Sequence, residues 1–143
     1  MKGIIFSIAA GLFISLQGVF NTRMSEKIGL WETNTFVHGS GFALTLILLL
    51  TVGKGSFSKL GEVNRLYMLG GVLGVLILFS VMNAISALGA TYSIAILLVT
   101  QLIGAIVIDS FGLFDSPIIK FDITKLFGII IMIIGIIVFK LKG

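Results

Sequence analysis

Long apolar stretches without a charged residue are the feature that most constrains this chain. Residues 42–50 and 129–139 carry no charge and lack the polar stripe of an amphipathic surface helix. Only 11% of the 143 residues are charged, whereas a soluble domain usually carries about 25%. A helix that crosses the hydrocarbon needs about 20 mostly apolar residues. The sequence therefore predicts an all-α membrane protein.

Polar breaks divide the apolar residues into five segments, expected at about residues 3–21, 33–52, 66–88, 92–109 and 123–139. The third and fourth form one run that is too long for a single span, and Gly89 is the expected turn between them. An alternative with four spans and a surface-lying last segment is weaker, because residues 129–137 are apolar all round. We predict a single five-helix transmembrane domain over residues 1–143.

The basic residues give a weak preference for one orientation. With five spans, six basic residues fall on the side of the N-terminus and four on the other side. This excess favours a cytoplasmic N-terminus in the cell inner (plasma) membrane. The near balance is also compatible with insertion in both directions, and hence with an antiparallel (inverted) homodimer. The six are Lys2, Lys54, Lys59, Arg65, Lys120 and Lys125, and the four are Arg23, Lys27, Lys140 and Lys142.

Polar side chains lie inside four of the five apolar segments or at their ends. A polar group in hydrocarbon is costly unless it pairs or meets water, and the simplest arrangement points these residues at a shared interior. Asn21 and Asn34 are close enough to helix ends to cap a helix or lie at the headgroups. The deeper ones either hold helices together or contact a solute. The candidate substrate-binding residues are Gln17, Asn21, Asn34, His38, Asn83 and Gln101.

Three charged residues are candidates for ion coupling or for an ion pair. Asp109 and Glu32 lie near helix ends, where an interfacial charge is the ordinary interpretation. In an inverted pair of chains, Arg23 of one copy would come to the same side of the membrane as Asp109 of the other. An ion pair between subunits is therefore one hypothesis.

No pattern in the sequence indicates catalysis. His38 is the only histidine, and no second ligand stands at the spacing of a metal site. Paired acids, a nucleophile with its base and cofactor motifs are not found. We therefore expect no enzyme activity, no catalytic residue, no metal and no cofactor. The net charge of +4 reflects basic residues that flank apolar segments, so nucleic acid is not an expected partner.

Several short motifs, in order along the chain, resemble the YdcZ-like family of the drug/metabolite transporter superfamily. The resemblance covers nearly the whole sequence. Thr100 departs from it, because a glycine is common there, and so does Ser110, where a histidine often follows the aspartate. The matching stretches are Gln17–Asn21, Phe36–Gly41, Gly70–Gly74, Gln101–Ile103 and Ile108–Leu113, together with Gly128 and Gly135.

The resemblance implies a five-helix unit that is similar to half of a ten-helix transporter with inverted halves. Such a unit would pair in the bilayer with an inverted second copy, or with a related chain. Distant relatives, the small multidrug resistance proteins, use an acid in the first helix to exchange protons for cations. The expected first span, residues 3–21, has no acid, and Gln17 cannot titrate, which argues against that mechanism.

The leading prediction is thus a transporter of a small solute by alternating access, with its site at the interface of a homodimer. The alternative is a non-transporting membrane scaffold or a subunit of a larger complex, in which the polar residues serve assembly. The sequence does not define the solute, the direction of transport or the driving ion.

Overall fold

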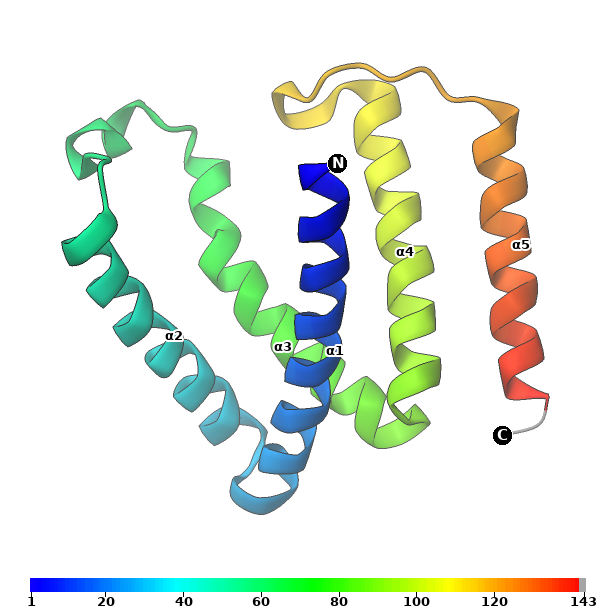
Figure 1. Cartoon of the computed structure of the whole chain (residues 1–143), viewed down its shortest axis with the longest axis horizontal. Coiled ribbons are helices and arrows are strands. Elements are labelled where there is room, and N and C mark those ends of the chain that lie inside the picture. Colours follow the sequence, from blue (N-terminus) through cyan, green and yellow to red (C-terminus); the bar gives the residue numbers. More distant parts are fainter. Residues whose placement is uncertain (142–143) are drawn as a thin grey trace. The chain divides into compact units, whose positions relative to one another are not determined.

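The computed structural model describes residues 1–141 as an all-helical chain. Within these residues, five helices are long and apolar enough to cross a membrane, as predicted. Lys142, which was counted for orientation, lies outside the described residues. The long helices are α1 (Lys2–Ile28), α2 (Leu30–Val52), α3 (Gly70–Leu88), α4 (Ala90–Phe111) and α5 (Ile123–Lys140), and the short 3₁₀ helices are η1 (Phe57–Glu62), η2 (Arg65–Leu69) and η3 (Leu113–Asp115) (Figure 1).

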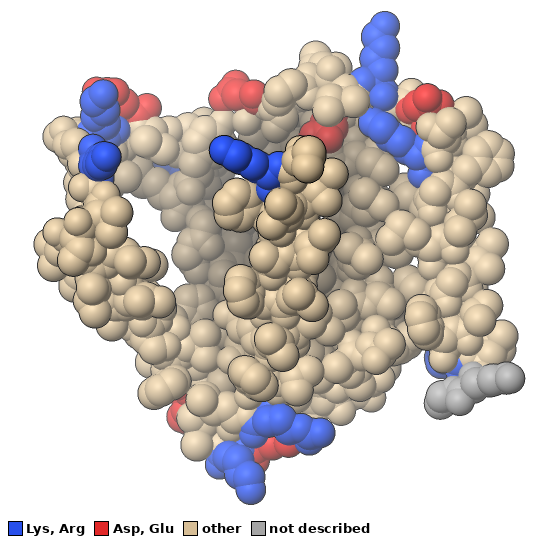
Figure 2. All heavy atoms as spheres, in the orientation of Figure 1, with Lys and Arg blue, Asp and Glu red and all other residues tan. Residues whose placement is uncertain are grey.

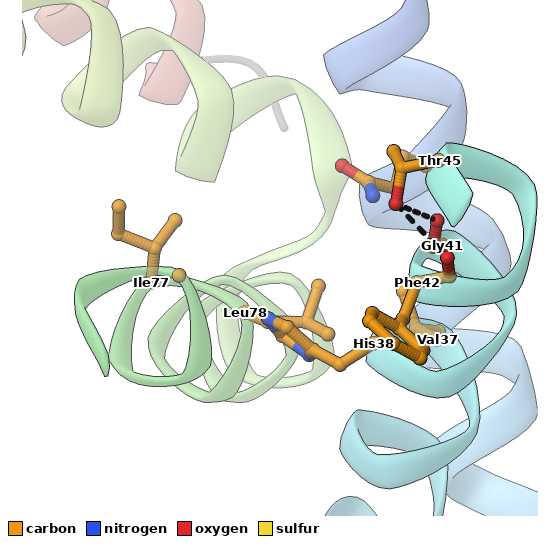
Figure 3. Close-up of a pocket in the computed structure, with 9 residues that line it drawn as sticks. Val37, His38, Gly41, Phe42, Thr45, Ile77 and Leu78 are labelled. Atoms are coloured by element: carbon orange, nitrogen blue, oxygen red, sulfur yellow. Dashed lines mark hydrogen bonds between the residues drawn. The ribbon is translucent and has the colours of Figure 1, made fainter. Parts of the chain in front are cut away.

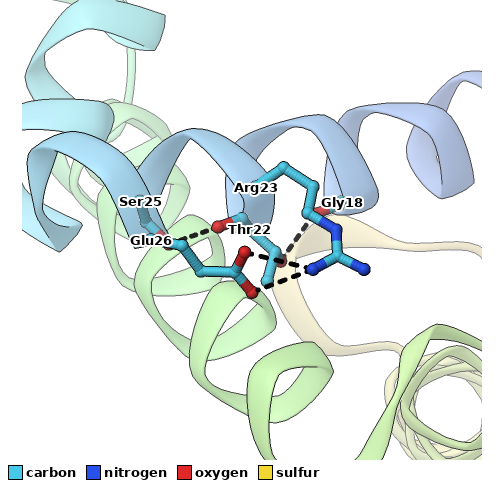
Figure 4. A network of polar contacts seen from close by, with 5 residues as sticks. All are labelled: Gly18, Thr22, Arg23, Ser25 and Glu26. Atoms are coloured by element: carbon cyan, nitrogen blue, oxygen red, sulfur yellow. Dashed lines mark hydrogen bonds and ion pairs between the residues drawn. The ribbon is translucent and has the colours of Figure 1, made fainter.

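The first connection is shorter than the sequence suggests. A polar stretch is expected from residue 21 to residue 32, but α1 continues to Ile28 and α2 begins at Leu30. Gly29 alone separates them, with a φ of 103° that glycine adopts without steric cost. Arg23 and Glu26 lie one turn apart on α1 and form an ion pair of 3.1 Å (Figure 4). Charged residues that favour a helix therefore extend α1 beyond its apolar part.

The turn expected at Gly89 is present. This residue has a φ of 80° and separates the end of α3 from the start of α4. The start of α5 is set by Asp122, whose side-chain oxygen accepts a hydrogen bond of 3.1 Å from the backbone N–H of Thr124. Such a cap satisfies one of the free N–H groups at a helix start.

The chain divides after Ala87 into two compact units. In the first unit, α1 and α2 meet at Gly29 and diverge towards their other ends (Figure 1). A Cβ atom on Gly18 of α1 would lie 2.9 Å from Cδ1 of Ile85 on α3, so this glycine lets the two helices pack closely. Close packing at small residues is a common way for helices to associate in lipid.

The second helix is attached to α3 at two points. The Nδ2 atom of Asn34 donates a hydrogen bond of 2.9 Å to the backbone oxygen of Val75. One turn earlier on α2, the ring of Trp31 stacks on that of Phe79, with 5.0 Å between the ring centroids. These contacts fix the half of α2 that is nearer to Gly29.

The interior of the first unit is small and mixed in character. Its buried residues include the apolar Leu78, Met82 and Ile85 and the polar Asn21, Thr22, Thr33 and Asn34. Most large apolar side chains are exposed, as expected where lipid replaces water as the solvent. Charged side chains gather at the ends of the helices, with uncharged surface between (Figure 2).

The second unit contains α4, η3 and α5. Here α4 and α5 run side by side (Figure 1), and Ser93, Val99 and Ile129 are buried. Near the end of α5, the Nζ atom of Lys140 lies 5.5 Å from the ring centroid of Tyr92 on α4.

Candidate functional site

A pocket of about 450 Å³ lies within the first unit, between α1, α2 and α3. Ligand pockets in proteins occupy roughly 300–1,000 Å³, so its size suits a small organic solute. All of its lining residues lie within the membrane-length helices and away from their ends. They are Gln17, Val37, His38, Gly41, Phe42, Thr45, Gly74, Ile77 and Leu78, most of which Figure 3 labels.

One face of α2 supplies much of this wall. The residues His38, Gly41, Phe42 and Thr45 follow a spacing of three, one and three, which places them together on a helix. Figure 3 shows the imidazole of His38 reaching from α2 towards α3. Facing it on α3 is Gly74, where a Cβ atom would lie only 3.2 Å from Nε2 of His38. A glycine at this point therefore makes room for the imidazole.

The two ring nitrogens of His38 have different environments. The Nδ1 atom lies 3.0 Å from the backbone oxygen of Asn34. A carbonyl oxygen only accepts hydrogen bonds, so Nδ1 is the donor and carries a hydrogen. In the neutral imidazole, Nε2 is then a hydrogen-bond acceptor. This atom has no hydrogen-bond partner within residues 1–141, and it is not fully buried.

The other two polar side chains of the pocket, those of Gln17 and Thr45, differ in whether they already form a hydrogen bond. Gln17 is exposed on α1, and its amide has no partner among the described residues. The hydroxyl of Thr45 is directed at its own helix, 2.9 Å from the oxygen of Gly41 and 3.0 Å from that of Phe42 (Figure 3). Its single hydrogen is thereby used, which leaves the oxygen as an acceptor.

Two predicted site residues, Asn34 and Asn21, lie outside the lining. Asn34 is buried and joins α2 to α3, and its backbone oxygen orients His38. Asn21 is also buried, with 6% of its surface exposed, and its Nδ2 atom has no partner within the described chain. The hydroxyl of the fully buried Thr33 is likewise unpaired there. Buried polar atoms of this kind are uncommon, and the sequence does not predict Thr33.

The remaining predicted polar residues are not among the pocket's lining. Asn83 is exposed on α3, and its Nδ2 atom donates 2.8 Å to the oxygen of Phe79 in the same helix. Gln101 is exposed on α4, in the second unit, and has no hydrogen-bond partner among residues 1–141. Neither residue joins helices within its own unit.

The three charged candidates also lie outside the pocket. Arg23 is paired with Glu26, so a contact with Asp109 of a second copy would have to compete with that pair. Asp109 is half-buried near the end of α4, where its backbone oxygen accepts a hydrogen bond of 2.9 Å from Ile119. Glu32 is exposed in the first turn of α2. Within residues 1–141, no group of three acidic, histidine or cysteine residues is placed to hold a metal ion.

Most of the pocket's wall is formed by residues that the sequence does not predict for the site. Val37, Phe42, Thr45 and Gly74 are among them. One pattern could have indicated part of this wall. Gly41 and Thr45 lie on the same face of the helix as Asn34 and His38, which the sequence does predict for the site. That signal is weak in an apolar helix, where most residues on every face have the same character.

The sequence matches the family described as "putative inner membrane exporter, YdcZ" over residues 3–138. No curated protein matches the chain, and no solved structure does. The family match covers all five apolar helices. It supports membrane transport as the activity, and a multi-pass location in the inner membrane. This chain therefore belongs to the YdcZ family of the drug/metabolite transporter superfamily.

Proposed function

We propose that this protein carries a small solute across the inner membrane by alternating access, and that the pocket between α1, α2 and α3 is its solute site. The observation that carries the proposal is the pocket itself, which offers an amide and an imidazole between apolar walls away from the helix ends. A few polar groups on a mostly apolar wall are typical of sites for small organic ligands.

We also propose that a second, inverted copy completes the site. Most lining residues of the pocket, Gln17 and Thr45 among them, are exposed in the single chain. Asn83 and Gln101 place further amides on exposed faces of apolar helices. Because a polar group facing lipid is costly, these positions favour cover by another protein surface. The near-balanced basic residues and the odd number of spans support an inverted partner.

The proposal is for a transporter and not an enzyme. The polar side chains at the pocket are an amide, an imidazole and a hydroxyl directed at its own helix. These groups bind and orient a solute through hydrogen bonds. They do not form a nucleophile with an adjacent base, which covalent catalysis requires.

Two glycines of α2 provide a matched test. Gly41 lines the pocket and Gly39 does not, and a Cβ atom on either would have nothing within 4 Å. A Cβ atom is therefore accommodated at both positions, but only at position 41 does a larger side chain, as in Gly41→Leu, occupy the pocket lining. In proteoliposomes assayed with a chemically diverse panel of labelled solutes, we expect flux from the unaltered chain and from Gly39→Leu. We expect Gly41→Leu to be nearly inactive.

Equal flux in the two variants would show that solute passes elsewhere. A folded dimer that carries no solute of the panel would contradict transport and favour a scaffold or subunit. Substitution of Gln17, which lines the pocket, by alanine distinguishes the same two roles, because loss of flux with intact assembly is expected only for a transporter.

The inverted pair is tested by labelling from outside the cell. The chain has no cysteine, so a single cysteine at Gly3 or at Leu141 reports one end without background and keeps every basic residue in place. We expect each end to be labelled in about half of the molecules. Labelling of one end only would overturn insertion in both directions.

A further inference from the structure

The polar atoms of the pocket restrict which solutes it accepts. Among its lining residues there is no aspartate, glutamate, lysine or arginine. A charged solute would leave water without an opposite charge to receive it, which is strongly unfavourable in an apolar site. The wall that one chain supplies therefore favours an uncharged solute.

Hydrogen-bonding capacity narrows the choice further. In the neutral imidazole of His38, the Nδ1 hydrogen is donated to the backbone oxygen of Asn34, which leaves Nε2 as an acceptor. The hydrogen of Thr45 is directed at its own helix, which leaves its oxygen as an acceptor. Gln17 is the third polar residue, and its amide both donates and accepts. Two of the three polar side chains thus offer only lone pairs to a solute.

Resting on the proposed function, we infer that the site takes an uncharged, largely apolar solute with a hydroxyl or N–H group, whose hydrogen is donated to Nε2 of His38. The apolar part of the solute lies against Phe42, Ile77 and Leu78. The amide of Gln17 can donate or accept a hydrogen bond, so it does not select between solutes that donate and solutes that accept.

A family of naphthalene probes tests the inference, because its members differ in one group. The four probes are β-naphthol, its methyl ether, the naphthoate anion and the naphthylmethylammonium cation. Binding is measured by equilibrium dialysis against the protein in lipid nanodiscs, with empty nanodiscs subtracted to remove partition into lipid. We expect naphthol to bind about three- to tenfold more tightly than its ether, as one net hydrogen bond allows, and both ions to bind more weakly than naphthol.

Two variants test whether His38 causes the preference for naphthol over its ether. In His38→Phe, which removes the acceptor, the ratio of naphthol to ether affinity should fall to about one. Ser40→Ala is the matched control, because Ser40 is exposed on α2 and lies outside the lining, and its ratio should equal that of the unaltered chain. The comparison of the two probes on the unaltered chain needs no variant, so it decides the question even if His38→Phe does not fold.

Equal affinity for naphthol and its ether would overturn the inference, as would preference for either ion, or a ratio unchanged in His38→Phe. Failure of all four probes to bind would overturn it as well. The proposed function is judged separately by flux through Gly41→Leu and Gly39→Leu. Equal flux in those two variants would contradict both proposals, whereas equal binding of naphthol and its ether would overturn this inference and leave the proposed function standing.

Discussion

The two units of this chain use different means to hold apolar helices together. In residues 1–87, polar and aromatic groups join the helices: Asn34 bonds to the backbone of α3, and Trp31 stacks on Phe79. In the second unit, Val99 of α4 and Ile129 of α5 are buried, and Lys140 lies over the ring of Tyr92 at one end.

This contrast has a functional meaning. A polar contact between helices in lipid fixes position and direction, whereas aliphatic packing is non-directional. The first unit therefore holds His38 in a defined place, since Asn34 both attaches α2 to α3 and orients the imidazole. Under the proposed function, α1–α3 are the helices that bind the solute.

The largest expected effect is at the contact between α1 and α3. Gly18→Leu would drive a side chain into Ile85 and Val81, since even a Cβ atom would lie 2.9 Å and 3.4 Å from their terminal carbons. Overpacking of this kind costs about 1–3 kcal/mol. The free energy of unfolding in mixed micelles measures it. Gly11→Leu is the control, because a Cβ atom there has nothing within 4 Å, and equal losses in the two variants would contradict the contact.

Asn34→Leu should come next. It removes the hydrogen bond between α2 and α3 from a residue that is only 3% exposed. A loss of about 1–2 kcal/mol in the free energy of unfolding is expected for such a bond in a membrane protein. Thr35→Leu alters the neighbouring, exposed residue of the same helix and should change little. An equal loss in the free energy of unfolding in both variants would show that this hydrogen bond does not stabilise the first unit.

A smaller effect is expected at the stacked rings. Phe79→Leu should cost about 0.5–1.5 kcal/mol of stability, the usual value of an aromatic pair. Trp31 is the only tryptophan, so its fluorescence spectrum reports the same change directly. Phe36→Leu, at an exposed position of α2, should leave that spectrum unaltered. An unchanged spectrum in Phe79→Leu would refute the stacking.

The smallest effect is expected in the second unit. Tyr92→Leu removes the ring beneath Lys140 and should cost about 0.5–1 kcal/mol, as an exposed cation–π contact does. Tyr92→Phe keeps the ring and should be nearly neutral. A double-mutant cycle with Lys140→Met isolates the pair in unfolding measurements. If Tyr92→Leu lost more stability than Asn34→Leu, the comparison of the two units would be reversed.

The helices were predictable because their signal is simple. Length and apolar composition identify a helix suited to the membrane without knowledge of its neighbours, and Gly89 marks a turn that few other residues would permit. The end of α1 was not predictable in the same way. Charge marks the limit of the apolar span, but residues such as Arg23 and Glu26 continue the helix beyond it.

The candidate site was less predictable, because the polarity of a residue does not reveal where its side chain points or what it contacts. Asn34, Asn83 and Gln101 are similar amides in similar apolar sequence. In the structure, the first joins two helices, the second bonds to its own helix and the third is exposed without a partner in the described chain. Likewise Gly11 and Gly18 look alike in sequence, but only Gly18 meets another helix within 4 Å.

Occupation of the first unit's pocket by solute can be measured directly. Thr45 lines this pocket, whereas Thr51 lies on the same helix outside it. Because the chain has no cysteine, a small thiol reagent can follow Thr45→Cys and Thr51→Cys individually in proteoliposomes. We predict that a transported solute slows labelling at position 45, in proportion to its occupancy, and leaves position 51 unaffected. Equal labelling at position 45 with and without that solute would contradict such occupation.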